Sequence, residues 1–288
     1  MTTVYQALKR TSIIDESLMA TMPENCCLYV HVALPFLSFS LFDRVRNKYI
    51  CLCEYRLPEE NQLDELTTIL KQDEILHTVG YHKTVVSFQS EKSVLAPTAF
   101  YSEDDAWRLL SLTSPLSDLE TLCADRLKYT DAVQVYALPS DLLNIIRSAF
   151  HSCKVVHSGT VLMESELLRN KNNTESSVTV NVRQGSYDIV VTTGNKLIYF
   201  NSFTYNSSED FIYYLLYVLE QLKLNPEKTS VRFLGEFDKH MASFLITAKY
   251  VRNLSFGSRP ESFEYSYGFS QVSNHAHAIL LNQYLCES

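Results

Sequence analysis

Three groups of side chains have the types and spacing that metal or acid–base chemistry requires. His275 and His277 are two residues apart and would share one face of a strand. The acidic run Glu103-Asp104-Asp105 could hold a cation, and Cys51 with Cys53 could supply two thiolates. Each group lacks a further ligand nearby in the sequence. We therefore expect a packed or surface histidine pair, a helix start at the acids and buried thiols, with no metal site and no catalytic residue.

Composition narrows the remaining classes of chemistry. The 288 residues contain only 7 glycines, which leaves little material for glycine-rich phosphate loops. No Gly-x-Ser-x-Gly nucleophile elbow is present. The net charge is −8 and the basic clusters are short, which excludes the extended basic surface of a typical nucleic-acid binder.

Localisation follows from the apolar runs and the cysteines. No apolar run approaches the roughly 20 residues that cross a bilayer, so no membrane span is expected. The first ten residues show no signal-peptide pattern. The 7 cysteines are odd in number and show no paired spacing, which does not suit a disulfide framework. These features predict a cytoplasmic protein.

Alternating apolar and polar residues predict the elements that would position any site. Residues 28–34, 38–42 and 48–57 predict an antiparallel meander, followed by a helix up to residue 76 and a strand at 83–89. Residues 121–128 and 132–138 predict a hairpin. A Pro-led helix from 139, a short strand at 154–157 and a helix at 159–168 complete the first half.

The same order of elements recurs after the polar stretch 170–177. Val178–Val182 resembles Leu28–Val32, and a helix predicted from Ser207 to Leu224 follows a second meander. Lys228–Glu236 matches Lys83–Glu91 at five of nine positions. We infer an internal duplication with an irregular lead-in at 1–25, a first subdomain at 26–170 and a second at 177–288.

A meander followed by a helix and a returning strand resembles the ribonuclease-H-like unit, and two such units in tandem resemble the α/β actin-like ATPase fold. Val133–Leu168 is similar to the corresponding region of bacterial pilus-assembly and cell-division actin homologues. The whole chain also resembles an uncharacterised bacterial family with an actin-like fold, on Asn195–Phe203, Ser208–Leu216 and Leu234–Glu236. The resemblance implies two subdomains, each a mixed sheet flanked by helices, and the closer family brings no known activity.

The actin-like resemblance implies a phosphate-binding hairpin in each half, each with an Asp-x-Gly turn. The first hairpin here, Ala33–Ser38, has neither acid nor glycine, and Pro35 removes an N–H donor. In the second hairpin, Asn181 stands in place of the aspartate and Arg183 in place of the glycine. An asparagine lacks the charge that holds a hydrated magnesium ion. Ordinary ATP hydrolysis is therefore not expected.

Two hypotheses remain open. The first is a non-catalytic member of the fold, without a cofactor, that acts through protein contacts. The rival is a divergent ATP-binding protein with magnesium, which would use Asn181, Gly185 and Ser186 on the phosphates and Gly235 near the base. A nucleotide-induced thermal shift would discriminate between them.

The helix predicted from Ser207 to Leu224 suggests where a protein could bind. One apolar stripe, which includes Phe211 and Leu215, must cover the second sheet, with Ser207 or Ser208 as the N-cap. Tyr213 and Tyr217 fall on another side of the helix. This side could be packed in the core of the subunit or could face a partner. Because tyrosine is enriched at interfaces, we favour the second interpretation for these two side chains, as the surface for an unknown protein partner or for a second copy of the chain.

Overall fold

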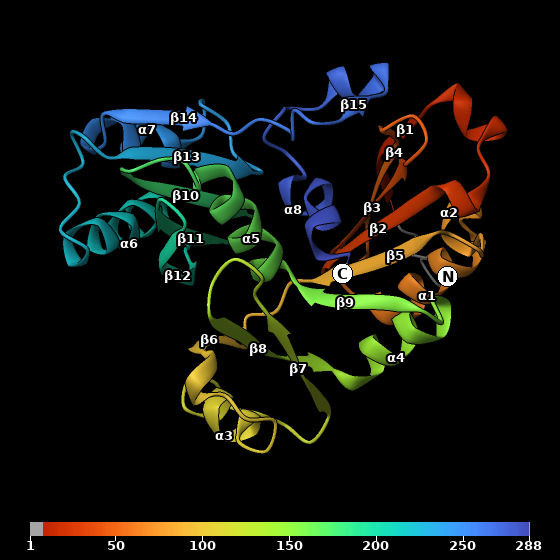
Figure 1. The fold of residues 1–288 in the computed structure, drawn as a ribbon, viewed down its shortest axis with the longest axis horizontal. Coiled ribbons are helices and arrows are strands. Elements are labelled where there is room, and N and C mark those ends of the chain that lie inside the picture. The colour runs from red at the N-terminus through yellow and green to blue at the C-terminus, as the bar shows by residue number, and fades with distance from the viewer. Residues whose placement is uncertain (1–7, 288) are drawn as a thin grey trace, which may run out of the picture.

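The computed structural model describes residues 8–287, and two large sheets with the same core strand order dominate it (Figure 1). The first sheet has the order β1-β4-β3-β2-β5-β9, and the second has the order β12-β11-β10-β13-β14. The strands near residues 28 and 178 therefore lie in different sheets, as the duplication predicts. Among residues 8–287, no helix is long and apolar enough to cross a membrane.

The first sheet contains the predicted meander, and helices cover both of its faces. Its strands are β2 (Cys26–Ala33), β3 (Phe36–Asp43), β4 (Lys48–Arg56), β5 (Lys83–Phe88) and β9 (Cys153–His157). One face packs on α1 (Gln62–Gln72) and α4 (Ser140–Ala149), and the short helix α2 (Glu74–His77) follows α1. The other face packs on α5 (Ser158–Asn170) and α8 (Ala278–Leu281). Because both faces are covered, β2 is buried along most of its length.

The second sheet repeats this plan. Its strands are β10 (Ser176–Arg183), β11 (Ser186–Thr193), β12 (Lys196–Thr204), β13 (Ser230–Gly235) and β14 (Asn253–Phe256). Helices α6 (Ser208–Gln221) and α7 (Ala242–Tyr250) pack on one face, and α5 lies against β11 and β12. Ser207 caps α6 and forms a capping box with Asp210, which confirms the predicted helix start.

A third, small sheet is inserted between β5 and α4. It contains β6 (Ser93–Pro97), β7 (Glu120–Arg126) and β8 (Ala132–Pro139) in the order β6-β8-β7. β7 and β8 are antiparallel, which confirms the predicted hairpin. The helix α3 (Ala106–Ser111) follows the acidic run and packs on this sheet.

Both ends of the described chain differ from the sequence-based expectation. The lead-in is not irregular, because β1 (Leu8–Ile14) pairs antiparallel with β4; residues 1–7 of that segment lie outside the described residues. The second subdomain, expected to span residues 177–288, also ends earlier, because the residues from 264 onwards pack on the first sheet. β15 (Glu264–Tyr265) pairs with β4, and the Tyr49 hydroxyl donates to the Leu281 carbonyl at 2.8 Å. Residues 264–286 pack on the first sheet, where they remove apolar surface of one face from water and pair with β4.

Candidate functional site

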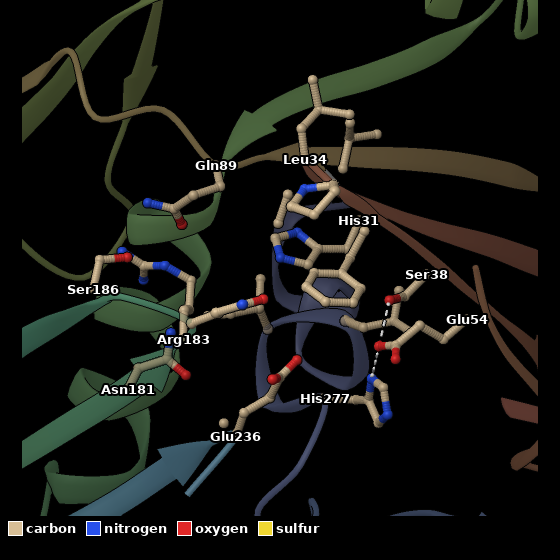
Figure 2. A pocket seen from close by; sticks show the side chains of 18 of the residues that line it. His31, Leu34, Ser38, Glu54, Gln89, Asn181, Arg183, Ser186, Glu236 and His277 are labelled. Atoms are coloured by element: carbon tan, nitrogen blue, oxygen red, sulfur yellow. Dashed lines mark hydrogen bonds and ion pairs between the residues drawn. The ribbon is translucent and has the colours of Figure 1, made fainter. Parts of the chain in front are cut away.

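A cleft of about 980 Å³ lies between the two large sheets, where the β2–β3 and β10–β11 hairpins approach each other (Figure 2). His31, Glu54 and Gln89 line it from the first sheet and its flanks, whereas Asn181, Arg183 and Glu236 line it from the second. The first helical turn of α8 adds Ala278 and Ile279 to the wall. A concave space of this size with convergent polar groups has the form of a ligand site.

The first hairpin presents an apolar turn to the cleft. Ala33 pairs with Phe36, so that Leu34 and Pro35 form a two-residue turn. The Leu34 side chain is exposed, and Pro35 has no N–H to offer a ligand. This turn therefore has one backbone amide fewer than a turn without proline.

In the second hairpin, Arg183 and the buried Asp188 form an ion pair at the place where the actin-like resemblance implies a phosphate-binding turn. The Asn181 amide donates to Asp188 Oδ2 at 3.2 Å, Ser202 donates to Oδ1 at 2.7 Å, and Arg183 Nη1 binds the same carboxylate. Burial raises the pKa of Asp188, but the charge of Arg183 and these hydrogen bonds outweigh it and lower the pKa. The acid of this hairpin thus lies on β11 and already accepts hydrogen bonds from three side chains.

Two further acids, which the sequence analysis did not single out, face the cleft from opposite sheets. Ser38 donates to Glu54 Oε2 at 3.2 Å, and Arg10 Nη1 lies 3.5 Å from Glu54 Oε1. Burial raises the pKa of Glu54. Burial also raises the pKa of Glu236, and the negative charge of Glu54 adds to that effect. Single acids at strand ends resemble solvated residues in a sequence, so no local pattern marks these two.

Neutral histidines line the same space. His31 Nδ1 lies 2.8 Å from Ser87 Oγ, and His277 Nδ1 lies 3.7 Å from Glu54 Oε2. Burial lowers the pKa of each imidazole to about 4, so both are uncharged at neutral pH. His275 also lines the cleft; its Nε2 lies 2.7 Å from the Phe237 carbonyl, and its ring packs at a tilt against Phe256.

Within residues 8–287, no three His, Cys, Asp or Glu side chains are grouped in a way that could hold a metal ion. Cys51 and Cys53 are buried, with their sulfur atoms 3.8 Å apart. Glu103 and its two acidic neighbours directly precede α3. The three groups that could have done chemistry therefore lie at three separate places in the fold.

The structure brings together three of the four residues of the ATP hypothesis. Asn181, Ser186 and Gly235 line the cleft, whereas Gly185 forms the tip of the second turn at φ +73° and is outside the lining. Gly235 has φ +80°, and a Cβ there would lie 2.2 Å from the Val182 carbonyl oxygen. Its N–H donates to the His275 carbonyl at 2.9 Å, so that amide is occupied within the protein.

The tyrosines of α6 lie on the surface, away from the cleft lining. Tyr213 is 62% exposed and Tyr217 is 47% exposed, and their rings stack with centroids 6.4 Å apart. Phe211 and Leu215 on the opposite side of the helix are fully buried against the second sheet. The two stripes of this helix therefore have the different environments that the sequence predicts.

Comparisons with solved structures agree with this architecture. A Bacteroides thetaiotaomicron protein with an actin-like ATPase fold and unknown function is 19% identical over 82% of this chain and 91% of that chain, with a TM-score of 0.76. A chain of the PilM–PilN type IV pilus biogenesis complex is 13% identical over 92% of this chain and 100% of that chain, with a TM-score of 0.61. The expected α/β actin-like ATPase fold is thereby confirmed.

Searches by sequence give the family. No curated protein matches the chain. One family model, described as a protein of unknown function (DUF3822), matches residues 15–254, which include the two hairpins together with Glu54 and Glu236 of the cleft. The chain belongs to the DUF3822 family, whose fold is that of the actin-like ATPases and whose function is unknown.

Proposed function

We propose that this protein is a member of the actin-like fold that neither binds nor hydrolyses Mg-ATP and that acts through protein contacts. The observation that carries the proposal is the pairing of Arg183 with Asp188, which occupies the hairpin position where a hydrolase needs a free acid and a glycine. Pro35 removes the corresponding amide from the first hairpin. The groups that bind magnesium and phosphate in phosphoryl transfer are thus replaced on both sides of the cleft.

The exposed tyrosines support the second half of the proposal. Tyr213 and Tyr217 offer rigid aromatic surface with hydroxyls at its rim, which suits protein recognition. The PilM–PilN complex provides an analogy, because it contains a chain of the same fold in a complex with another protein. The analogy concerns the mode of action and does not identify a partner.

The alternative is an ATP-binding protein with magnesium. It is favoured by the position of Asn181, Ser186 and Gly235, which line one cleft of about 980 Å³. In that case Glu54 and Glu236, which line the cleft from opposite sheets, would be candidates to hold the magnesium in place of a hairpin aspartate.

Calorimetric titration with Mg-ATP separates the two functions. We expect no binding at micromolar concentrations. A dissociation constant of about 10 µM or tighter, equivalent to about 7 kcal/mol, contradicts the proposal. The Ser186→Ala and Asn181→Ala variants then show whether such binding occurs in this cleft, because each removes one lining group.

We also propose the cytoplasm as the compartment of this protein. All seven cysteines are free, and five of them are buried among apolar side chains, as expected for thiols in a reducing environment. Mass spectrometry after alkylation of freshly lysed cells tests this, because a cytoplasmic protein should carry seven reduced thiols.

A further inference from the structure

The two large sheets differ at their equivalent strands β4 and β12, because a further strand pairs with β4 and none pairs with the outer edge of β12 among the described residues. In the first sheet, β4 follows β3 with a register shift at Ile50, and β1 then pairs antiparallel with residues 51–56 of β4. In the second sheet, β12 follows β11 with a register shift at Ile198, which leaves residues 199–204 in the corresponding place. No strand within residues 8–287 pairs with the outer edge of β12 (Figure 1).

This open edge lacks the features that usually prevent strand pairing. Residues 199–204 read Tyr-Phe-Asn-Ser-Phe-Thr and contain no charge and no proline. The nearest charge, Lys196, lies before the shift at Ile198. An uncharged edge rich in aromatic residues is ready to accept another strand, and β1 shows that the same position in this fold accepts one in the antiparallel direction.

We propose that a second copy of this chain pairs with β12, so that the two β12 strands form one continuous sheet across a two-fold axis. A two-fold axis perpendicular to a sheet makes the paired strands antiparallel, which is the direction that β1 takes on β4. This inference rests on the proposed action through protein contacts and identifies the partner.

The side chains of β12 select one register for this pairing. Residues that face each other across the axis must lie on the same side of the sheet, so one residue must face its own copy. Asn201 suits that place, because an amide is both donor and acceptor and can bond a second amide. Tyr199 then faces Phe203 of the second copy, an aromatic cross-strand pair, and the reverse pair forms by symmetry.

The aromatic side of α6 extends this seam. Tyr199 and Phe203 lie on the face of β12 that α6 covers, and Phe203 stacks on Tyr214 with centroids 5.1 Å apart. Tyr213 in turn packs edge-on against Tyr214 with centroids 5.2 Å apart and stacks on Tyr217. Tyr213 and Tyr217 therefore flank the open edge, where the α6 of a second copy would approach them.

Cysteine cross-linking tests the register directly. In the Asn201→Cys variant, only a symmetric pairing centred on this residue brings the two thiols within disulfide reach, about 4.4–6.8 Å between Cα atoms. We expect a covalent dimer on a non-reducing gel after mild oxidation. The wild type and the Thr204→Cys variant are controls, because Thr204 is exposed but would lie several residues from its own copy. A dimer from Thr204→Cys but not from Asn201→Cys overturns the register.

A charge on the axis tests the association itself. Asn201→Asp places two carboxylates opposite each other, whereas Asn201→Ser keeps a neutral hydrogen-bonding side chain. By size exclusion with light scattering from about 1 to 100 µM, we expect dimers for the wild type and Asn201→Ser, and dimerisation at least about tenfold weaker for Asn201→Asp. The thermal stability of the monomer should be nearly unchanged, since Asn201 is exposed.

A wild type that stays monomeric at about 100 µM and gives no Asn201→Cys cross-link overturns the inference. The Mg-ATP titration keeps this result separate from the proposed function. A monomer that does not bind nucleotide refutes only the dimer, whereas a dimer that binds Mg-ATP at about 10 µM refutes only the proposal that the protein binds no nucleotide.

Discussion

The amide of Asn181 donates a hydrogen bond to Asp188 Oδ2 at 3.2 Å, from one strand of the second hairpin to the next. The acid of this hairpin therefore lies on β11 and is held by Arg183 and Ser202. A carboxylate with all these partners has little capacity left for a hydrated cation. Position 181 on β10 is a neutral asparagine and not the aspartate that the actin-like motif implies. The single negative charge of Asp188 is therefore balanced by the positive charge of Arg183.

The first prediction follows from this balance. Asn181→Asp restores the residue that the actin-like motif expects, but it buries a second carboxylate beside Asp188, where both must share Arg183. We expect a loss of about 3 kcal/mol of unfolding free energy at pH 7 and no gain of ATP hydrolysis. Asn181→Ala, which removes one hydrogen bond, should cost only about 1 kcal/mol.

The pH dependence of Asn181→Asp has a defined sign. The new carboxyl should have a pKa above its unfolded value of about 3.9, so its penalty grows as the pH rises from there to the folded pKa. Urea unfolding should therefore show a smaller difference from the wild type at pH 5 than at pH 8. An equal difference at both values would mean that the new acid stays ionised and well paired.

The second prediction compares two glycines with similar backbone angles. Gly235 and Gly185 have φ values of +80° and +73°, but a Cβ on Gly235 would meet the Val182 carbonyl oxygen at 2.2 Å, whereas nothing lies within 4 Å of a Cβ on Gly185. Gly185→Ala should cost about 1 kcal/mol from backbone strain alone, and Gly235→Ala about 3 kcal/mol or more. Chemical denaturation of both variants measures the difference; similar costs would contradict close packing between β13 and β10.

The third prediction concerns the two sides of α6. Tyr213→Glu and Tyr217→Glu should change monomer stability by no more than about 0.5 kcal/mol, because both side chains are exposed. Leu215→Ala is the control and should cost about 2–5 kcal/mol, because Leu215 is fully buried. Light scattering should show weaker association for the tyrosine variants. If both tyrosine variants fail to fold, the surface assignment is wrong.

The fourth prediction concerns His157, which caps α5. Its Nδ1 accepts from the Gly159 N–H at 3.0 Å, and Nε2 lies 3.1 Å from the Ser90 carbonyl, so the ring must be neutral with its proton on Nε2. Burial lowers its pKa to about 4. The unfolding free energy that depends on a neutral His157 is fully present above the unfolded pKa of about 6.5. It is lost as the pH falls towards 4, because the unfolded chain binds the proton more tightly than the folded chain.

We expect the neutral state of His157 to account for about 3 kcal/mol of the unfolding free energy lost between pH 7 and pH 4, and urea unfolding over that range measures it. His157→Asn keeps a side chain that caps helices but removes the titrating group. This variant should show a shallower loss of stability over that range. The same slope in both proteins would assign the acid sensitivity to the other neutral histidines, His31 and His277.

The sequence predicts the parts of this fold that local patterns encode. The run Leu28–Val32 predicts a strand by its valine, leucine and tyrosine residues, although its burial does not alternate because both faces are covered. Ser207 with Asp210 marks a helix start within four residues. β1 could not be predicted in this way, because Ile13 is the one buried residue of this strand, as is common for an edge strand. The contact of Gln283 Nε2 with the Val30 carbonyl spans 253 positions and leaves no local trace.

In the cleft, too, some residues could be predicted from the sequence and others could not. Sequence reasoning finds Asn181, Ser186 and Gly235 because a motif fixes their spacing, and it finds what the hairpins lack. It misses Asp188, Glu54 and Glu236, because their roles depend on which strands become neighbours and on burial that only the packed chain creates. Strand pairing and desolvation, rather than residue type, define these three acids.

The return of residues 264–286 to the first sheet sets the order in which the protein can mature on the ribosome. The strands β2 to β5 are translated early, but the segment that carries β15, α8 and Gln283 is translated only after the whole second sheet. Until then, the face of the first sheet that bears Tyr29 and Tyr49 lacks part of its cover. The half that is made first is therefore completed last, and the two halves cannot mature as independent units during translation.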